Sequence, residues 1–114
     1  MDEVEQRLVD FAVRVIKLAA YLPQTQAGEY LAEQLLRSGT TSAAHYVAGR
    51  CAGDNSTGRE QLVLCLQQLH LVRLWLTIIT KADLLTSTQL ENITAENDEL
   101  CRLLSTSLHK CDPA

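Results

Sequence analysis

Three histidines, His45, His70 and His109, are the side chains best suited to proton transfer near neutral pH. They fall in three different segments, and no HExxH, GxSxG or ExxH motif accompanies them. A di-iron helical bundle needs inward carboxylates at ExxH spacing, whereas most acidic residues here lie near the chain ends or on polar faces. We therefore predict that the protein is not an enzyme and holds no cofactor, with His45 a polar residue satisfied within the fold.

The four cysteines, Cys51, Cys65, Cys101 and Cys111, form no CxxC pair. Zinc ligands usually come in such closely spaced pairs, so we predict no metal site. The first residues, MDEVEQRLVDF, are acidic, unlike a secretory signal or a transit peptide. We expect a cytoplasmic protein whose cysteines are reduced and mostly buried; their pattern leaves any redox role open.

The segment RSGTTSAAHY, residues 37–46, raises the question of a phosphate-binding loop. A Walker loop needs GxxxxGK[ST] between a strand and a helix, and this segment has no lysine, no second glycine and no strand before it. Its small residues instead repeat at helical spacing, which lets two helix backbones approach closely. A glycine inside a helix costs about 1 kcal/mol of helix stability relative to alanine, so we infer that position 39 needs a residue without a side chain. The residues predicted to pack closely are Ser38, Gly39, Ser42 and Ala43.

Composition indicates one helical domain over residues 1–114. The chain is 46% hydrophobic but only 4% aromatic, and it has two prolines. Such a core consists mainly of aliphatic side chains on long helices. The longest apolar stretch, residues 62–79, contains Gln67, Gln68, His70 and Arg73, which disfavours a membrane span. The formal net charge of −4 weighs against a nucleic-acid binder, which is usually basic.

Four helices are expected. The first covers residues 2–22, with Asp2 and Glu5 as its start signal and Pro23 as its stop. The second begins after PQTQAG and ends near residue 50, and residues 51–58 form a linker. Apparent capping boxes start the last two helices, at Thr57 with Glu60 and at Thr88 with Glu91. The third helix ends near residue 81.

Apolar residues alternate in steps of three and four along these segments, as in helix bundles. The first helix has the seam Val4, Leu8, Phe11, Val15, Leu18 and Leu22. The last helix has the seam Leu90, Ile93, Asn97, Leu100, Leu104 and Cys111. No alternation of period two competes. Short connections favour antiparallel neighbours, so the predicted fold is an all-α, up-down-up-down four-helix bundle.

Three segments carry a resemblance to a known family: LVDFAVRVIKLAAYLP at 8–23, QLLRSGTTSAAHY at 34–46 and RLWL at 73–76. Together they resemble the four-helix-bundle proteins encoded in intervening sequences of bacterial large-subunit ribosomal RNA genes. The resemblance implies an antiparallel bundle that assembles into a ring of five subunits. It also brings in a relative, the accessory protein of diversity-generating retroelements, which is basic and works with a reverse transcriptase and nucleic acid.

The sequence departs from the family's usual pattern at several positions. His45 stands where the family usually has asparagine, and Ala48 and Gly49 stand where it usually has Glu-Ala. The acidic residues that the family carries near Gln68 and Leu71 are missing. Any role of those polar groups in the family is therefore not transferred to this chain.

The third helix is apolar over well more than half of its circumference. A helix on the outside of a monomeric bundle buries one stripe and exposes the rest to water, so this pattern predicts that another subunit covers it. Trp75 fits either an interface anchor or the core of its own bundle. The predicted interface residues are Leu64, Leu71, Trp75 and Ile78. We expect a homo-oligomeric scaffold or interaction module whose partner is a protein or a ribonucleoprotein.

Positive charge gathers in the middle of the chain. Residues 31–73 hold four arginines against three acidic residues, in a protein that is acidic overall. In a ring, these arginines would form a repeated basic set able to contact phosphate. Ordinary solvated or intersubunit charges are the alternative, and the net charge favours it. The candidate contacts to nucleic acid or to a partner are Arg37, Arg50, Arg59 and Arg73.

Overall fold

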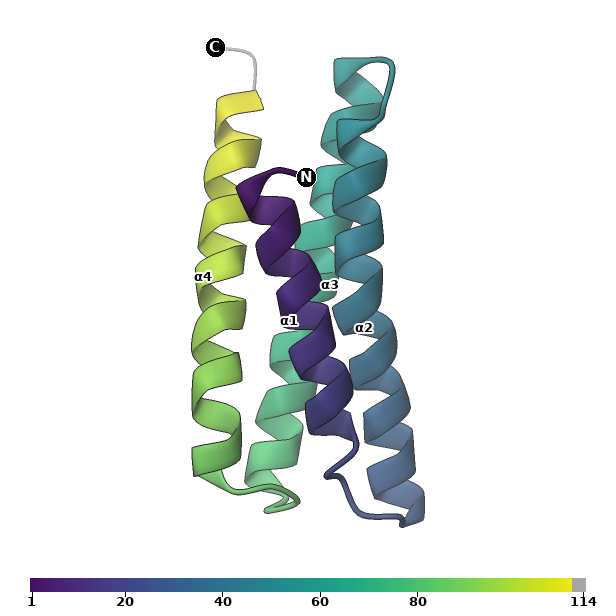
Figure 1. The fold of residues 1–114 in the computed structure, drawn as a ribbon, viewed down its shortest axis with the longest axis vertical. Helices are drawn as coiled ribbons and strands as arrows, with labels where there is room; N and C mark the ends of the chain where they lie inside the picture. The colour runs from purple at the N-terminus through teal and green to yellow at the C-terminus, as the bar shows by residue number, and fades with distance from the viewer. Residues whose placement is uncertain (112–114) are drawn as a thin grey trace.

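The computed structural model describes the backbone of residues 1–111 and the side chains of residues 1–110. Within that part of the chain there are four helices and no strand. The bundle measures 46 × 21 × 20 Å, with the helices running along its long axis (Figure 1). The predicted all-α, up-down-up-down four-helix bundle is confirmed. The helices are α1 (Glu3–Ala19), α2 (Gln26–Arg50), α3 (Asn55–Lys81) and α4 (Ser87–Cys111).

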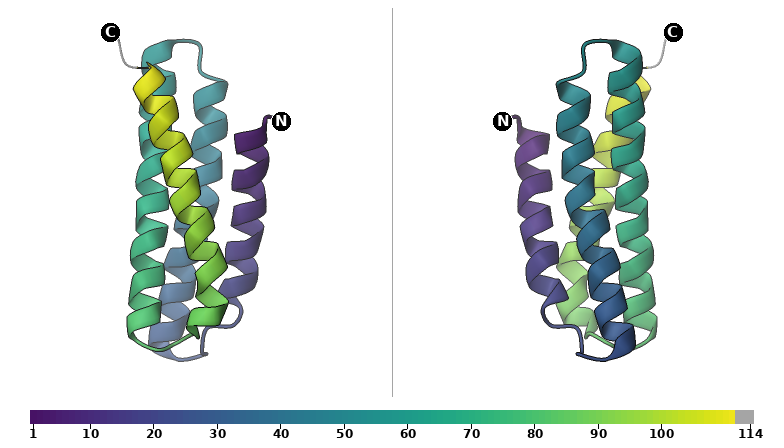
Figure 2. Two further views of the ribbon diagram at one scale, coloured as in Figure 1. Left: turned by 90° about the vertical axis from the view of Figure 1, so that its left-hand side faces the viewer. Right: turned by 90° about the vertical axis from the view of Figure 1, so that its right-hand side faces the viewer.

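Helices that follow one another in sequence are neighbours in space, so α1 and α3 lie at opposite corners of the bundle (Figure 2). The most extensive contact is between α2 and α3, and the least extensive is between α1 and α4. The helix α1 is shorter than the others, so the turn from α2 to α3 extends beyond its start (Figure 1). All four helices share one core.

The core is aliphatic, as the composition predicts. Fully buried side chains come from every helix and include Leu8, Phe11, Val15, Leu35, Cys65, Leu69, Val72, Ile79, Leu100 and Leu104. The predicted seam of the first helix is confirmed, with Val4 only partly buried. The seam of the last helix is confirmed except at Cys111, whose side chain lies outside the described residues. These seams hold the outer faces of the helices in fixed positions.

The start of α1 is as predicted, and its end is not. Asp2 caps the helix by accepting a hydrogen bond from the Glu5 N–H at 2.7 Å. The helix ends at Ala19 rather than Leu22. The N–H groups of Tyr21 and Leu22 bond three residues back instead of four, which tightens the chain before Pro23. Leu22 stays buried although it is not helical.

The predicted starts of the last two helices are wrong. Asp54 caps α3 by accepting from the Thr57 N–H, so residues 55–58 are helical and the linker is shorter than expected. In α4 the reciprocal capping box joins Thr86 and Gln89, two residues before the predicted pair. Several side chains in each segment can cap, and the sequence does not rank them. The second helix also starts earlier, with Thr25 as its cap.

A polar cluster ties the start of α1 to the end of α2. The Tyr46 hydroxyl donates to Asp2 at 2.8 Å, and Arg50 pairs with Asp2 and Glu5. Burial tends to raise the pKa of Asp2. The Glu5 N–H, the Tyr46 hydroxyl and the Arg50 charge outweigh this and hold the pKa below its usual value. Burial and the neighbouring carboxylate raise the pKa of Tyr46, so its hydroxyl stays protonated.

The lowered pKa of Asp2 predicts a stability that depends on pH. A carboxyl with a depressed folded pKa stabilises the fold above its unfolded pKa of about 3.9, and this contribution is lost as the pH falls through the folded value. We expect Asp2→Ala to lower the free energy of unfolding by about 1 kcal/mol at pH 7. The difference should shrink below about pH 4. Urea denaturation of both proteins across this range measures it.

Asp2→Asn is the matched control, because asparagine also caps helices but carries no charge. It should lose less stability than Asp2→Ala at pH 7. A difference between Asp2→Ala and the parent that stays constant down to pH 2 would contradict the assignment to ionised Asp2.

Candidate interaction surface

The outward face of α3 carries a row of apolar side chains that nothing in the described chain covers. Leu64, Leu71, Leu74 and Ile78 are 36%, 38%, 46% and 38% exposed. Their spacing of seven, three and four residues places them along one line of the helix, like the a and d positions of a coiled coil. We call these four residues the α3 stripe. Such a row is typical of a helix that packs against a further helix.

Trp75 lies beside the α3 stripe, on the side of α3 that contacts α2. Its indole N–H donates to the Ser38 hydroxyl at 3.3 Å. The Tyr30 ring meets it edge-on, with 6.4 Å between the ring centroids. Trp75 is half-buried and packs against the core, while Tyr30 is 55% exposed. Trp75 thus contributes to its own bundle and still borders the exposed surface.

The segment of small residues is part of α2 and is not a loop. Ser38, Gly39 and Ser42 are buried, and Ala43 packs partly buried against the core. A Cβ on Gly39 would lie 2.9 Å from a methyl group of Val15, so α1 approaches α2 closely there. The Ser42 hydroxyl donates back to the Gly39 carbonyl. The small residues therefore face α1 on one side and α3 on the other.

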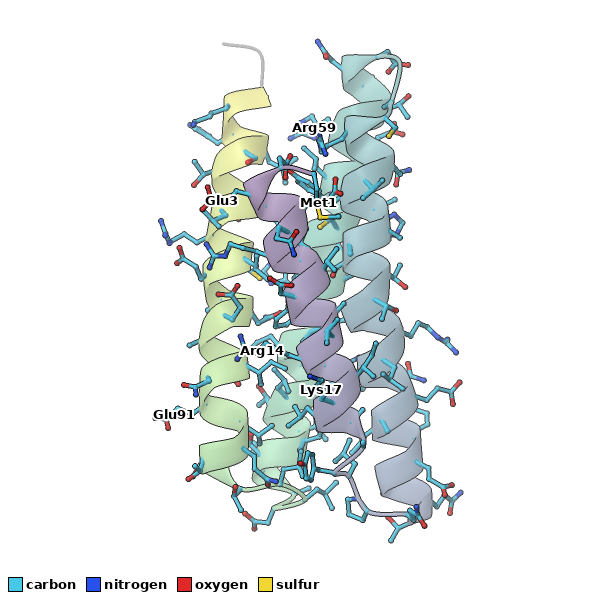
Figure 3. All side chains as sticks on the ribbon, viewed as in Figure 1. Met1, Glu3, Arg14, Lys17, Arg59 and Glu91 are labelled. Atoms are coloured by element: carbon cyan, nitrogen blue, oxygen red, sulfur yellow. The ribbon has the colours of Figure 1, made fainter. Side chains whose placement is uncertain are left out.

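The four candidate arginines do not gather into one patch. Arg37 pairs with Glu33 on the exposed side of α2, and Arg73 pairs with Asp98 on α4. Arg50 and Arg59 are brought together, because both line one hollow with Lys110 where α2 turns into α3. Arg59 lies at that end of the bundle, above Met1, in Figure 3.

An apolar row on α1 was missed by the sequence analysis, although its spacing of four, three and four residues was available. Val13 and Ile16 are 43% and 49% exposed. Val9, partly buried, and Ala20, exposed at the C-cap just beyond α1, extend the row in both directions. We call Val9, Val13, Ile16 and Ala20 the α1 stripe. The core seam of the same helix repeats at the same spacing and is longer, so the pattern alone does not separate the two rows.

The described part of the chain shows no grouping of His, Cys, Asp or Glu that could hold a metal ion. His45 bonds through Nδ1 to the Gln61 side chain at 2.9 Å, while His70 and His109 are exposed elsewhere. Asn97 is fully buried; its amide N–H donates to the Leu69 carbonyl, and its own oxygen has no partner. The bond of His45 connects α2 with α3, and the bond of Asn97 connects α4 with α3.

The cysteines differ in their surroundings. Cys65 is buried as expected, whereas Cys51 is exposed, contrary to that expectation, and Cys101 is intermediate. Burial, with a smaller effect of neighbouring Cys101, raises the pKa of Cys65 to about 12. Burial also raises the pKa of Cys101 to about 11. Both side chains are therefore thiols, not reactive thiolates, at neutral pH.

We expect an aromatic disulfide reagent at pH 8 to label Cys51 rapidly, and Cys65 and Cys101 only after unfolding in guanidinium. A Cys111→Ser variant removes the fourth thiol, so that thiol counting by absorbance is unambiguous. Rapid reaction of two or three thiols in the folded protein would contradict the burial described above.

By length and composition alone, α3 could cross a membrane, and 28% of its most apolar 18-residue stretch is buried. Most of that stretch thus lies at the surface of the single chain. Its inner side supplies Leu69 and Leu76 to the core. One side of α3 is therefore part of a bundle, and the other side exposes apolar surface.

No protein-family model matches the chain, and no curated protein does. Among solved structures, it is similar to a protein of unknown function from the S23 ribosomal protein family of Bacteroides thetaiotaomicron. The two chains are 26% identical, with a TM-score of 0.87, over 92% of this chain and 97% of that chain. The bundle is thus shared, nearly end to end, with another all-helical protein.

Proposed function

We propose that this protein is a non-catalytic homo-oligomeric scaffold, a ring of helical bundles that presents its outer surface to a protein or ribonucleoprotein partner. The observation that carries the proposal is the α3 stripe. It has coiled-coil spacing, it is exposed over residues 64–78 of α3, and none of its four residues is charged. If this apolar surface stayed exposed to water, the protein would tend to aggregate.

The family membership and the subunit number are part of the same proposal. The three sequence segments resemble the intervening-sequence family, and the all-helical relative has the same bundle. A ring of five subunits is the arrangement that this resemblance implies, and the cytoplasmic location is proposed from the acidic first residues. The α3 stripe supports assembly without specifying how many copies take part.

Size-exclusion chromatography with light scattering tests the proposal directly. One subunit has a mass of 12.6 kDa, so a particle near five times that mass is expected from the purified chain. A monomer that stays soluble at micromolar concentration would contradict self-association. Recovery of the chain only from detergent-extracted membranes would also contradict it, because lipid would then cover the α3 stripe.

A nucleic-acid-binding accessory role is the second candidate. It is favoured by one observation, the hollow that Arg50, Arg59 and Lys110 line together with Asp54, where Arg50 also pairs with Asp2 and Glu5. A ring would repeat this hollow once per subunit, and phosphate contacts made by several copies would add. Absorbance at 260 and 280 nm across the same chromatographic peak detects bound nucleic acid. A salt-sensitive RNA complex that Arg59→Ala weakens would support this role over the first.

A further inference from the structure

Two cations near the end of α1 have exposed side chains, Arg14 and Lys17, one turn apart (Figure 3). Among the described residues, no ion pair joins either of them to a carboxylate. Asp10, one turn before Arg14, accepts from the Gln6 amide instead. Both positive charges are thus left for solvent or for a ligand.

Arg14 and Lys17 line one hollow between the end of α1 and the start of α4. Its volume is about 440 Å³, and small-molecule sites usually have about 300–1,000 Å³. No acidic side chain of the described residues lines it. Two other hollows hold a carboxylate beside their cations, since Glu91 lies with Lys81 in one and Asp54 lies with Arg59 in the other. The hollow at Arg14 is therefore positive in a protein whose net charge is −4.

A neighbouring ion pair shows which group is missing from this hollow. One heptad before Arg14, Arg7 donates to Glu96 of α4 at 2.7 Å. The helices α1 and α4 run in opposite directions, and a step of seven residues returns to the same face of a helix. The counterpart of Arg14 is therefore Gln89, seven residues before Glu96, and Gln89 does line the hollow. At this second position the arginine is kept, and a neutral amide stands where the first has a carboxylate.

The polar groups that surround the two cations can act as hydrogen-bond donors. The side-chain oxygen of Gln89 is occupied, because it accepts from the N–H and the hydroxyl of Thr86. Its amide N–H groups are what it can offer to a ligand. Tyr21 adds a hydroxyl and Asn92 adds a second amide to the same lining. An anion in this hollow would thus meet positive charge and donors from α1, from α4 and from the turn after α1.

We infer that this hollow binds a small phosphate monoester that carries a flat ring, such as a nucleoside monophosphate. A phosphate monoester has a charge of about −1.5 to −2 at pH 7, so it matches two cations, whereas a carboxylate matches one. Arg14 holds the phosphate oxygens as Arg7 holds the carboxylate of Glu96, and Lys17 adds a second charge. The site lies within one subunit, so it goes beyond the proposed function and does not depend on assembly.

Apolar residues of the hollow provide the surface for the ring. Leu18 and Ile93 are buried beneath it, and Tyr21 is 69% exposed beside them. An exposed aromatic side chain next to an apolar surface can stack on a flat ring. The Tyr21 N–H donates to the Leu18 carbonyl at 3.0 Å, which holds the backbone of Tyr21 beside the hollow. The same lining therefore accounts for both parts of the ligand.

Isothermal titration calorimetry with adenosine monophosphate tests the site, and adenosine is the matched control ligand. In dilute buffer, where surface charges are least screened, the monophosphate should bind once per subunit and adenosine should not bind. Arg14→Gln and Lys17→Gln should each weaken binding about tenfold, because each removes a charge-assisted contact. Lys81→Gln makes the same change of charge outside the hollow, so its affinity should equal that of the parent.

Gln89→Glu tests the assignment of the missing carboxylate. Glutamate can form the capping box with Thr86 as glutamine does, so the start of α4 is kept. The new carboxylate should pair with Arg14, as Glu96 pairs with Arg7, and should weaken binding by more than about tenfold. The helical circular-dichroism spectrum should stay unchanged.

Three results would contradict this inference. Absence of monophosphate binding to the folded parent would overturn the site, and so would an equal loss of affinity in Lys81→Gln and Arg14→Gln. Inorganic phosphate that bound as tightly as the monophosphate would overturn the role of Tyr21 and Leu18 in holding a ring. Calorimetry counts ligand per subunit, so a failure here leaves the proposed assembly intact, and light scattering tests that assembly separately.

Discussion

Leu71→Glu should convert the assembled protein into soluble monomers. Leu71 is at the centre of the α3 stripe and is 38% exposed in the single chain, so a carboxylate there is tolerated by the fold. In an interface the same carboxylate would be buried without a partner, which costs about 3 kcal/mol or more at each contact. This corresponds to a more than 100-fold weaker association. Light scattering should report 12.6 kDa, with an unchanged helical circular-dichroism spectrum.

His70→Glu is the matched control. It introduces the same charge one residue away, on the same exposed helix but outside the α3 stripe. This variant should keep the mass of the parent. If Leu71→Glu also kept that mass, the α3 stripe would not be the interface.

Gly28→Ala should destabilise the fold by about 3 kcal/mol or more, since it forces overpacking against a rigid neighbour. A Cβ on Gly28 would lie 2.0 Å from the carbonyl oxygen of Pro23, which is backbone and cannot rotate away. The turn from α1 to α2 would have to open. Urea denaturation at a fixed subunit concentration should show a lower midpoint, because assembly makes stability depend on concentration.

Two other glycines serve as graded controls. Gly39→Ala should be nearly neutral, because the helical preference of alanine offsets the contact with Val15, while Gly39→Leu should destabilise by about 1–3 kcal/mol. Gly53→Ala has nothing within 4 Å of the added carbon and should leave stability unchanged. Equal effects at all three positions would show that backbone flexibility, not crowding, explains the result.

The fold could be predicted because apolar residues recur at helical spacing along the sequence. The apolar seams of α1 and α4 place the buried side chains correctly, and Asp2 caps α1 as expected. The starts of α3 and α4 were not predictable, because neighbouring residues such as Asp54 and Thr57 are both good caps. Only the three-dimensional course of the chain decides which of them meets a free N–H.

The candidate surface was only partly predictable. Leu64, Leu71 and Ile78 were expected at an interface, and the excess of apolar residues on α3 pointed to them. Leu74 completes their line, but a helix that is apolar almost all round does not reveal which residues face the core. The tightest glycine, Gly28, was missed because its neighbour Pro23 lies across a turn. Its crowding depends on the path of that turn rather than on local pattern.

The uneven strength of the helix contacts has a consequence for how the chain acquires its structure. The contact between α2 and α3 is the most extensive and spans a short turn, so it closes with little loss of chain entropy. The contact between α1 and α4 is the least extensive and joins distant parts of the chain, with Arg7 and Glu96 held by two hydrogen bonds. Folding should therefore spread outward from the α2–α3 hairpin. The α3 stripe would then be exposed before α1 and α4 pack against each other. Association between incompletely folded copies would therefore compete with this last step of folding.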